Sequence, residues 1–231
     1  MFAEWPCPQP GGDSRGEMAR VFAGKDRKHR LLVIPPLFDE HNKLRRQLVE
    51  VMHRLDLSGI DSVLPDLPGW NESLAALEAQ SMDSWREAVR AAVAHFKPTR
   101  FLAVRAGCLL VPIGLPGWDY APLGGKQVLR GMVRARIIAS KEADREETSD
   151  ELMAMARNVG IELAGWKLGP ELVTQLESAE PAESPLRSRI DQATVGGKPL
   201  WLRAEPDEDP EQADAIAAII AIAIDSTGGF E

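Results

Sequence analysis

The sequence predicts an α/β protein built on a mostly parallel sheet with helices on both faces. Short apolar runs at 31–34, 60–64 and 100–104 alternate with two segments whose apolar residues recur at helical spacing. Strands that alternate with helices of this length form βαβ units with right-handed crossovers, in which the strands run parallel. A chain of 231 residues with 44% hydrophobic side chains is also long and apolar enough for one domain with a substantial core.

The first part of the chain leads into this pattern. Residues 1–29 are rich in Pro, Gly and charge, so we expect an irregular leader with at most one short edge strand at 19–23. The run at 31–34 is continuously apolar, as is typical of a strand buried on both faces. A helix is expected from about residue 40 to 55, with Asp39 as its cap.

The next elements complete a strand–helix–strand–helix–strand order. The run 60–64 is the second strand, and Asp66-Leu67-Pro68-Gly69 after it has the composition of a tight turn. Ser81 is the expected cap of the second helix, and 100–104 is the third strand. Ligands of such sheets bind beyond the carboxyl ends of the strands, so the residues that follow each strand are the candidates for a site.

The second half of the chain is less regular. Helical periodicity over 126–140 and again over 148–157 predicts a helical insertion at about 124–157 that acts as a partial cap. The remaining expected elements are strands at 118–122, 160–165, 186–190 and 199–203, and helices at 170–176 and 209–224.

Composition excludes several function classes. The formal net charge of −8 disfavours nucleic-acid binding, which needs a basic face. The longest apolar run, at 215–224, is about half of the roughly 20 residues that cross a bilayer, so we expect no membrane span. The Gly-Gly-Lys triplets at 124–126 and 196–198 lack the other residues of a phosphate-binding loop, and we expect no cofactor.

Cysteine usage bears on the cellular compartment. Cys7 and Cys108 are too few for a disulfide framework and favour a reducing environment. The first residues contain no basic segment followed by an apolar run, so we expect no secretory signal. These observations together predict a cytoplasmic protein.

The third strand runs into a turn of small residues with one large exception. Residues 103–107 read Ala-Val-Arg-Ala-Gly, at the place where an α/β-hydrolase carries its G-x-S-x-G nucleophile elbow, and Arg105 occupies the nucleophile position. A guanidinium stays protonated and cannot attack a carbonyl. Arg105 is therefore either a structural clamp on a carboxylate or carbonyls, or an anion-binding residue at a strand end and helix start.

The histidines exclude a Ser-His-Asp triad in the order that this fold uses. That order places the general-base histidine after the nucleophile and the acid. His29, His41, His53 and His95 all precede the elbow. Cys108 follows the elbow, but cysteine is among the most buried residue types, so a structural thiol is favoured over a nucleophile.

Polar residues that follow the first two strands complete a candidate ligand pocket. We expect Glu40, Asn42, Arg45 and Asp66 to lie near Arg105 and to bind a small anionic ligand with it. For the first two residues helix capping is the open alternative, and for Asp66 it is the tight turn. No metal site is expected, because no second His or Cys lies at ligand spacing from His41.

Several stretches of the chain resemble one bacterial family, the exosortase A system-associated hydrolases of the type called hydrolase 2. The resemblance covers roughly residues 31–225 and implies an α/β-hydrolase-like fold, a gene context of exosortase and exopolysaccharide systems, and arginine as the usual elbow residue. The chain departs from the family at Ala103, where glycine is usual, and is shortened after Gly107. The matching stretches are 35–46, 66–69, Trp85, 104–107, 118–125, 134–136, 163–166 and 199–201.

These observations give one leading function and two alternatives. The leading hypothesis is a catalytically degenerate hydrolase-like protein that binds a small anionic ligand or a partner near Arg105. The first alternative is an active hydrolase in which Glu40 or Asp66 activates water. The second is an assembly module that forms a homodimer through the broad apolar stripe of the 126–140 helix.

Overall fold

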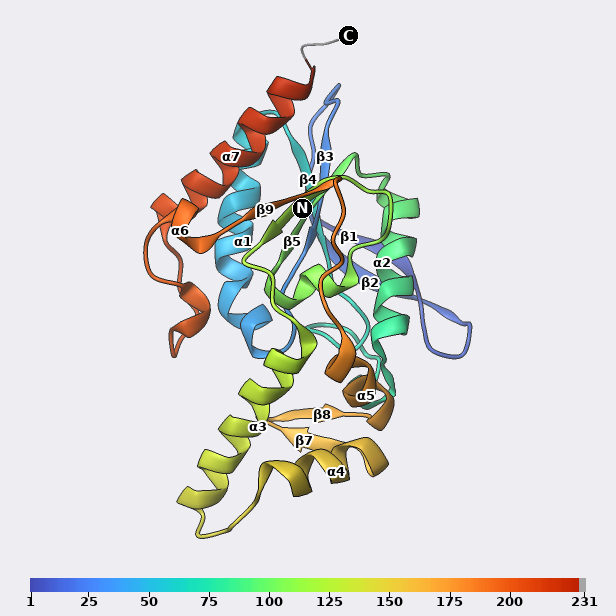
Figure 1. Ribbon diagram of the computed structural model, residues 1–231. Coiled ribbons are helices and arrows are strands. Elements are labelled where there is room, and N and C mark those ends of the chain that lie inside the picture. The colour runs from blue at the N-terminus through green and yellow to red at the C-terminus, as the bar shows by residue number, and fades with distance from the viewer. Residues whose placement is uncertain (229–231) are drawn as a thin grey trace.

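The computed structural model describes residues 1–228 and has one seven-stranded sheet with the strand order β1-β2-β4-β3-β5-β6-β9 (Figure 1). The five strands β4, β3, β5, β6 and β9 run parallel, whereas β2 pairs with β4 and β1 pairs with β2 in the antiparallel sense. The predicted α/β class with a mostly parallel sheet is therefore confirmed. The strands are β1 (Phe2–Pro8), β2 (Ser14–Phe22), β3 (Arg30–Ile34), β4 (Asp61–Pro65), β5 (Arg100–Val104), β6 (Gly117–Tyr120) and β9 (Arg187–Ile190).

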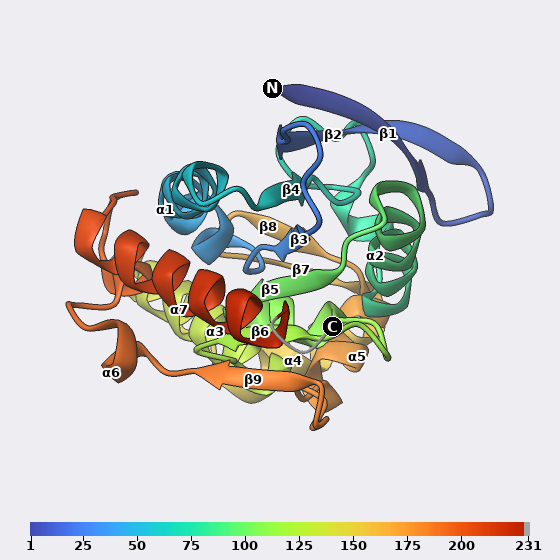
Figure 2. The same ribbon diagram turned by 90° about the horizontal axis from the view of Figure 1, so that it is seen from above.

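Helices cover both faces of this sheet, as Figure 2 shows from above. On one face lie α1 (Asp39–Leu57) and α7 (Pro210–Gly228), which pack against each other and against side chains such as Leu31 and Val33. On the other face lies α2 (Met82–Phe96). Successive residues of a buried parallel strand point to opposite faces, so β3 supplies both cores.

The N-terminal segment is not the irregular leader that its composition predicted. β1 and β2 form a hairpin, and Trp5 lies opposite Glu17 in its register. Trp5 and Cys7 are buried against α2 while Phe2 and Glu4 are exposed, which is the alternation of a half-buried strand. The prolines that suggested a loop are accommodated because β1 is at the edge of the sheet, where an amide donor can be missing.

A buried carboxylate fastens this hairpin to the loop after β4. Glu17 is 4% exposed, and its Oε1 accepts hydrogen bonds from the Ser73 hydroxyl at 2.7 Å and from Gln9 Nε2 at 3.3 Å. Burial raises the pKa of the Glu17 carboxyl, and the nearby charge of Asp66 acts in the same direction. The carboxylate is thus held where its ionised form is costly.

We expect Glu17→Gln to stabilise the protein at neutral pH, because the amide oxygen can still accept both hydrogen bonds. A carboxyl whose folded pKa is raised lowers the free energy of unfolding as pH rises from its unfolded value of about 4.3 to its folded value. The gain in thermal midpoint should therefore be present at pH 8 and vanish near pH 4. Thermal melts across this range test it, with Glu4→Gln on the same hairpin as control. An equal gain at every pH would contradict the explanation.

The two helix starts that the sequence assigned differ in outcome. Ser81 caps α2 as predicted, in a reciprocal capping box with Ser84. Asp39 does not cap α1, because the cap position is Phe38, whose φ is 54° and which makes no capping side-chain hydrogen bond. Asp39 instead lies in the first turn and pairs with Lys43 at 2.8 Å, one turn further on.

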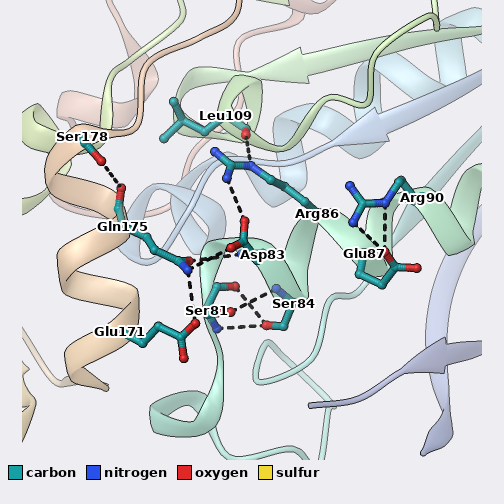
Figure 3. A network of polar contacts seen from close by, with 10 residues as sticks. All are labelled: Ser81, Asp83, Ser84, Arg86, Glu87, Arg90, Leu109, Glu171, Gln175 and Ser178. Atoms are coloured by element: carbon teal, nitrogen blue, oxygen red, sulfur yellow. Dashed lines mark hydrogen bonds and ion pairs between the residues drawn. The ribbon is translucent and has the colours of Figure 1, made fainter. Parts of the chain in front are cut away.

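The segment between β6 and β9 forms a layer beyond the carboxyl edge of the sheet (Figure 1). The layer begins with two helices, which follow the pattern expected for 124–157. A small hairpin and a third helix come next, and only the first strand of that hairpin was predicted. Figure 3 shows one attachment of this layer: Gln175 of α5 and Asp83 of α2 exchange two hydrogen bonds. On the same face of α2, Arg86 donates a hydrogen bond to the carbonyl oxygen of Leu109, in the turn that follows β5. The elements are α3 (Gly125–Glu142), α4 (Ser149–Val159), β7 (Ile161–Leu163), β8 (Trp166–Leu168) and α5 (Pro170–Ser178).

The connection from β9 to α7 also differs from expectation. The segment 199–203 is not a strand but the single 3-10 turn η3 (Leu200–Leu202), which follows the short helix α6 (Gln192–Val195). Leu200 is buried and Leu202 is 76% exposed, so the turn inserts one side chain into the core without pairing with β9. This turn also carries Trp201 towards the carboxyl ends of the strands.

Candidate functional site

The elbow geometry is kept although its nucleophile is absent. β5 ends at Val104, Arg105 has a φ of 54°, and the chain continues as the 3-10 turn η2 (Arg105–Leu110) in place of a full helix. Gly107 lets the turn pack directly on the end of β3. A Cβ there would lie 2.7 Å from the carbonyl oxygen of Ile34 and closer still to that of Pro35. Glycine is therefore the residue that permits this approach.

Arg105 is held from three sides. Its Nε and Nη2 donate to the two carboxylate oxygens of Glu40 at 3.0 and 3.1 Å, which is a bidentate pair. Its Nη1 donates to the carbonyl oxygen of Ala121 at 2.9 Å, and its guanidinium lies 4.2 Å from the ring centroid of Trp201. The side chain is 12% exposed, so the guanidinium is fixed by α1, by the end of β6 and by η3 together.

A triad would need an acid and a base beside the elbow residue. In the chain order of the fold, both residues come after the elbow. Among the described residues after the elbow, Ala121 accepts a hydrogen bond from the Arg105 side chain and Trp201 lies against its guanidinium, and neither side chain is an acid or a base of a triad. Asp119 on β6 is a carboxylate that follows the elbow in the chain, as the acid of a triad would. Arg187 of β9, however, donates hydrogen bonds to both of its oxygens at 2.7 Å.

A cavity of about 410 Å³ lies between the elbow and α3. Its walls are mostly apolar, with Phe38, Ala106, Met132 and Trp201 among them. Its polar lining comes from Asp39, Glu40 and Gln127. The size is in the range of pockets that bind small molecules.

Arg45 and Asp66 form a second cluster, away from Arg105. Arg45 Nη1 donates to Asp66 Oδ1 at 2.9 Å, and Asn71 Nδ2 donates to the same oxygen at 2.6 Å. The ring Nε2 of His41 lies 2.7 Å from Asn71 Nδ2 and 3.2 Å from Arg45 Nη1. Since both neighbours are donors, His41 Nε2 is an acceptor and the imidazole is neutral. Burial and the Arg45 charge lower the pKa of His41 to about 3.

The structure thus divides the predicted pocket into two. Arg105 and Glu40 lie together beside the elbow cavity, and Arg45 and Asp66 lie together beside another cavity, of about 600 Å³, next to the N-terminal hairpin. Asn42 is exposed on α1 and lines neither cavity. Whether any of these five residues binds a ligand stays a prediction.

Sequence reasoning missed three residues of these clusters: His41, Asn71 and Trp201. Their signals were weak but present. His41 precedes Arg45 by one helical turn, so the two side chains share a face of α1. Asn71 belongs to the loop that follows β4, where a site was expected. Trp201 lay in a segment that was predicted to be a strand, which hid its position opposite the elbow.

The two thiols are inert in this setting. Burial raises the pKa of Cys108 well above its ordinary value and raises that of Cys7 to about 12, so neither is a thiolate at neutral pH. Among residues 1–228, no group of three or more His, Cys, Asp or Glu side chains is placed to hold a metal ion. Within the same residues, none of the helices has the length and apolar character needed to cross a bilayer.

Comparison with known proteins identifies the fold. No protein-family model matches the chain, and no curated protein matches its sequence significantly. Solved structures do match along nearly the whole length. A putative hydrolase from Agrobacterium vitis S4 has a TM-score of 0.59 at 12% identity, covering 98% of each chain. The esterase domain of a Rhodothermus marinus protein has a TM-score of 0.55 at 10% identity, covering 96% of this chain and 97% of that one.

A third match is the mouse alpha/beta hydrolase domain-containing protein 10, with a TM-score of 0.54 at 12% identity over 97% of this chain and 99% of that one. At such identities the likeness concerns the fold alone. The chain has an α/β-hydrolase-like fold, as the elbow turn and the strand order had indicated.

Proposed function

We propose that this hydrolase-like chain is catalytically degenerate and binds a small, mostly apolar molecule in the cavity between the elbow and α3. One observation carries the proposal: Arg105 stands in the nucleophile position and is bound by Glu40, Ala121 and Trp201. The apolar cavity beside this cluster remains large enough for a ligand.

Charge decides the class of ligand that we propose. The sequence alone suggested an anion held by Arg105. Glu40 already neutralises that guanidinium, and Asp39 adds a negative charge to the cavity lining. An uncharged ligand with a small polar end, such as a fatty alcohol or ester, therefore fits the cavity better than an anion.

The alternative of a carboxylate-activated hydrolase finds less support. Glu40 and Asp66 were its candidate bases, and each is engaged by an arginine, Arg105 and Arg45 respectively. A carboxylate whose oxygens are bound by a guanidinium has less room to accept a hydrogen bond from a water molecule, which opposes general-base chemistry.

The proposal also covers the biological system and the cellular compartment of the protein, and this part of it rests on the sequence. The elbow arginine and the other family-like stretches support a role beside exosortase and exopolysaccharide systems. The free, buried Cys7 and Cys108 support a reducing, cytoplasmic compartment. We further propose that the chain is one domain in which α3, α4 and α5 act as the cap.

Binding of the uncharged dye Nile red tests the pocket. We expect saturable fluorescence enhancement that Ala135→Trp weakens at least about tenfold, because Ala135 lines the cavity and the larger side chain would fill it. Ala139→Trp, one turn further along α3 and exposed outside the cavity lining, is the matched control and should bind as the parent does. If the two variants bound Nile red with equal affinity, the dye would bind elsewhere and the proposed ligand site would be wrong.

Two further measurements separate the alternatives. Decanol should displace the dye at a lower concentration than decanoate does. The reverse order would favour the anionic ligand that the sequence suggested. The chain should not hydrolyse 4-nitrophenyl butyrate above background. Turnover that Arg105→Ala abolished would show that the site is catalytic.

A further inference from the structure

A third cavity lies on the opposite side of α3 from the elbow cavity. It is an open groove of about 530 Å³ between α3 and α4, and it is continuous along α3 from Lys126 to Lys141. Leu129, Val133 and Met153 give it an apolar floor. A span of 15 residues of helix corresponds to about 22 Å, so the groove is long and narrow.

One wall of this groove is a row of cations. Lys126, Arg130, Arg134 and Lys141 all line it, and all four are exposed. The first three recur every fourth residue, which places them one above another on the helix. In the described part of the chain, none of the four forms a salt bridge, whereas Arg136 on the same helix pairs with Glu147.

This row is unusual for a chain with a net charge of −8. The acidic residue that lines the groove, Glu177, is already bound by Arg157 through two hydrogen bonds of 2.9 and 2.8 Å. Lys126 lies near Glu177, but Arg130, Arg134 and Lys141 have no such neighbour among the groove residues. The residues that line the groove therefore carry more positive than negative charge.

We propose that the groove is a docking site for an acidic amphipathic helix of a partner protein. Such a helix would place apolar side chains on the floor and carboxylates, spaced one turn apart, against Lys126, Arg130 and Arg134. A ligand needs both features to match this surface. A purely polar anion would leave the apolar floor without contacts, and a purely apolar ligand would leave the cations without partners.

Three other occupants fit less well. A single-headed lipid would engage one end of a row that spans about four turns of helix. A flat anionic membrane would also meet the exposed residues Glu142, Asp144, Glu146 and Asp150, whereas a docked helix can lie over Lys126, Arg130 and Arg134, nearer the other end of α3. A two-fold contact with a second copy would bring the same cations against each other, which is repulsive.

The test uses a fluorescein-labelled peptide of about 18 residues, helix-forming, with Leu on one face and Glu at every fourth position beside it. We expect it to bind, to bind more weakly as salt is raised, and to lose about tenfold or more in affinity with Arg130→Glu/Arg134→Glu. The same peptide with Lys in place of Glu should bind that double variant better than it binds the parent.

Lys25→Glu/Lys28→Glu is the matched control, since it changes the net charge equally in an exposed loop before β3. It should leave peptide binding within about twofold. Equal binding of the Glu and Lys peptides, or equal losses in both double variants, would overturn the proposal. So would light scattering that reveals a dimer broken by Arg130→Glu/Arg134→Glu, or binding to phosphatidylserine vesicles, but not to the peptide, with the same dependence on these arginines.

Discussion

Gly107→Ala is expected to destabilise the folded protein by about 3 kcal/mol or more, although it adds a single methyl group. The added Cβ would meet the carbonyl oxygens of Ile34 and Pro35, which belong to the backbone at the end of β3 and cannot rotate away. The elbow would have to move off the strand. For a chain of this length the thermal midpoint should fall by about 6 to 12 °C in a calorimetric or circular-dichroism melt.

Gly131→Ala makes the same chemical change with the opposite expected sign. Gly131 lies in the middle of α3, and a Cβ there meets no atom within 4 Å. Alanine lowers the conformational entropy of the unfolded chain, so this variant should gain about 0.5 to 1 kcal/mol. If both variants lost stability equally, the packing of the elbow on β3 would not be the cause.

His41 is expected to make the fold sensitive to mild acid. Its folded pKa is lowered to about 3, while an unfolded histidine titrates near 6.5. The unfolded chain therefore binds the proton first, and stability that is complete above pH 6.5 is lost as pH falls towards 3. Each pH unit in this window costs up to about 1.4 kcal/mol, so the loss from His41 between pH 7 and pH 4.5 is about 2 to 3 kcal/mol.

Urea unfolding at the two pH values measures this. In His41→Gln the difference between pH 7 and pH 4.5 should shrink by that amount, even though the variant is less stable at pH 7 for want of the ring packed on Trp70. His53→Gln, at an exposed position on the same helix, is the control and should keep the parent's pH dependence. An unchanged difference in His41→Gln would mean that the imidazole is protonated in the folded protein.

Periodicity was enough to predict the central sheet. The continuous apolar runs of β3 and β5 and the 3.6-residue spacing of α1 and α2 leave few other folds, because buried parallel strands need helices on both faces. The N-terminal hairpin was missed because its prolines hide a two-residue alternation. Only its place at the sheet edge makes Pro6 and Pro8 tolerable, and edge position is a property of the tertiary fold.

The candidate site was predicted only in part, because its arrangement also depends on the tertiary fold. Sequence order places Glu40, Arg45 and Asp66 after strands that end at the same edge, but the direction of a side chain around α1 decides which neighbour it meets. Glu40 and Arg45 are five residues apart and so project about 140° from each other, one towards Arg105 and the other towards Asp66. Predicting that division requires the orientation of α1 on the sheet.

Helix α3 is a wall shared by two cavities. Val128 and Met132 line the side that faces the elbow, and Leu129 and Val133 line the groove on the other side. An occupant of either cavity would therefore contact the same helix. If an occupant of either cavity favours a different position of this helix, the affinity of the other cavity changes, and reciprocity requires that the factor be the same in both directions.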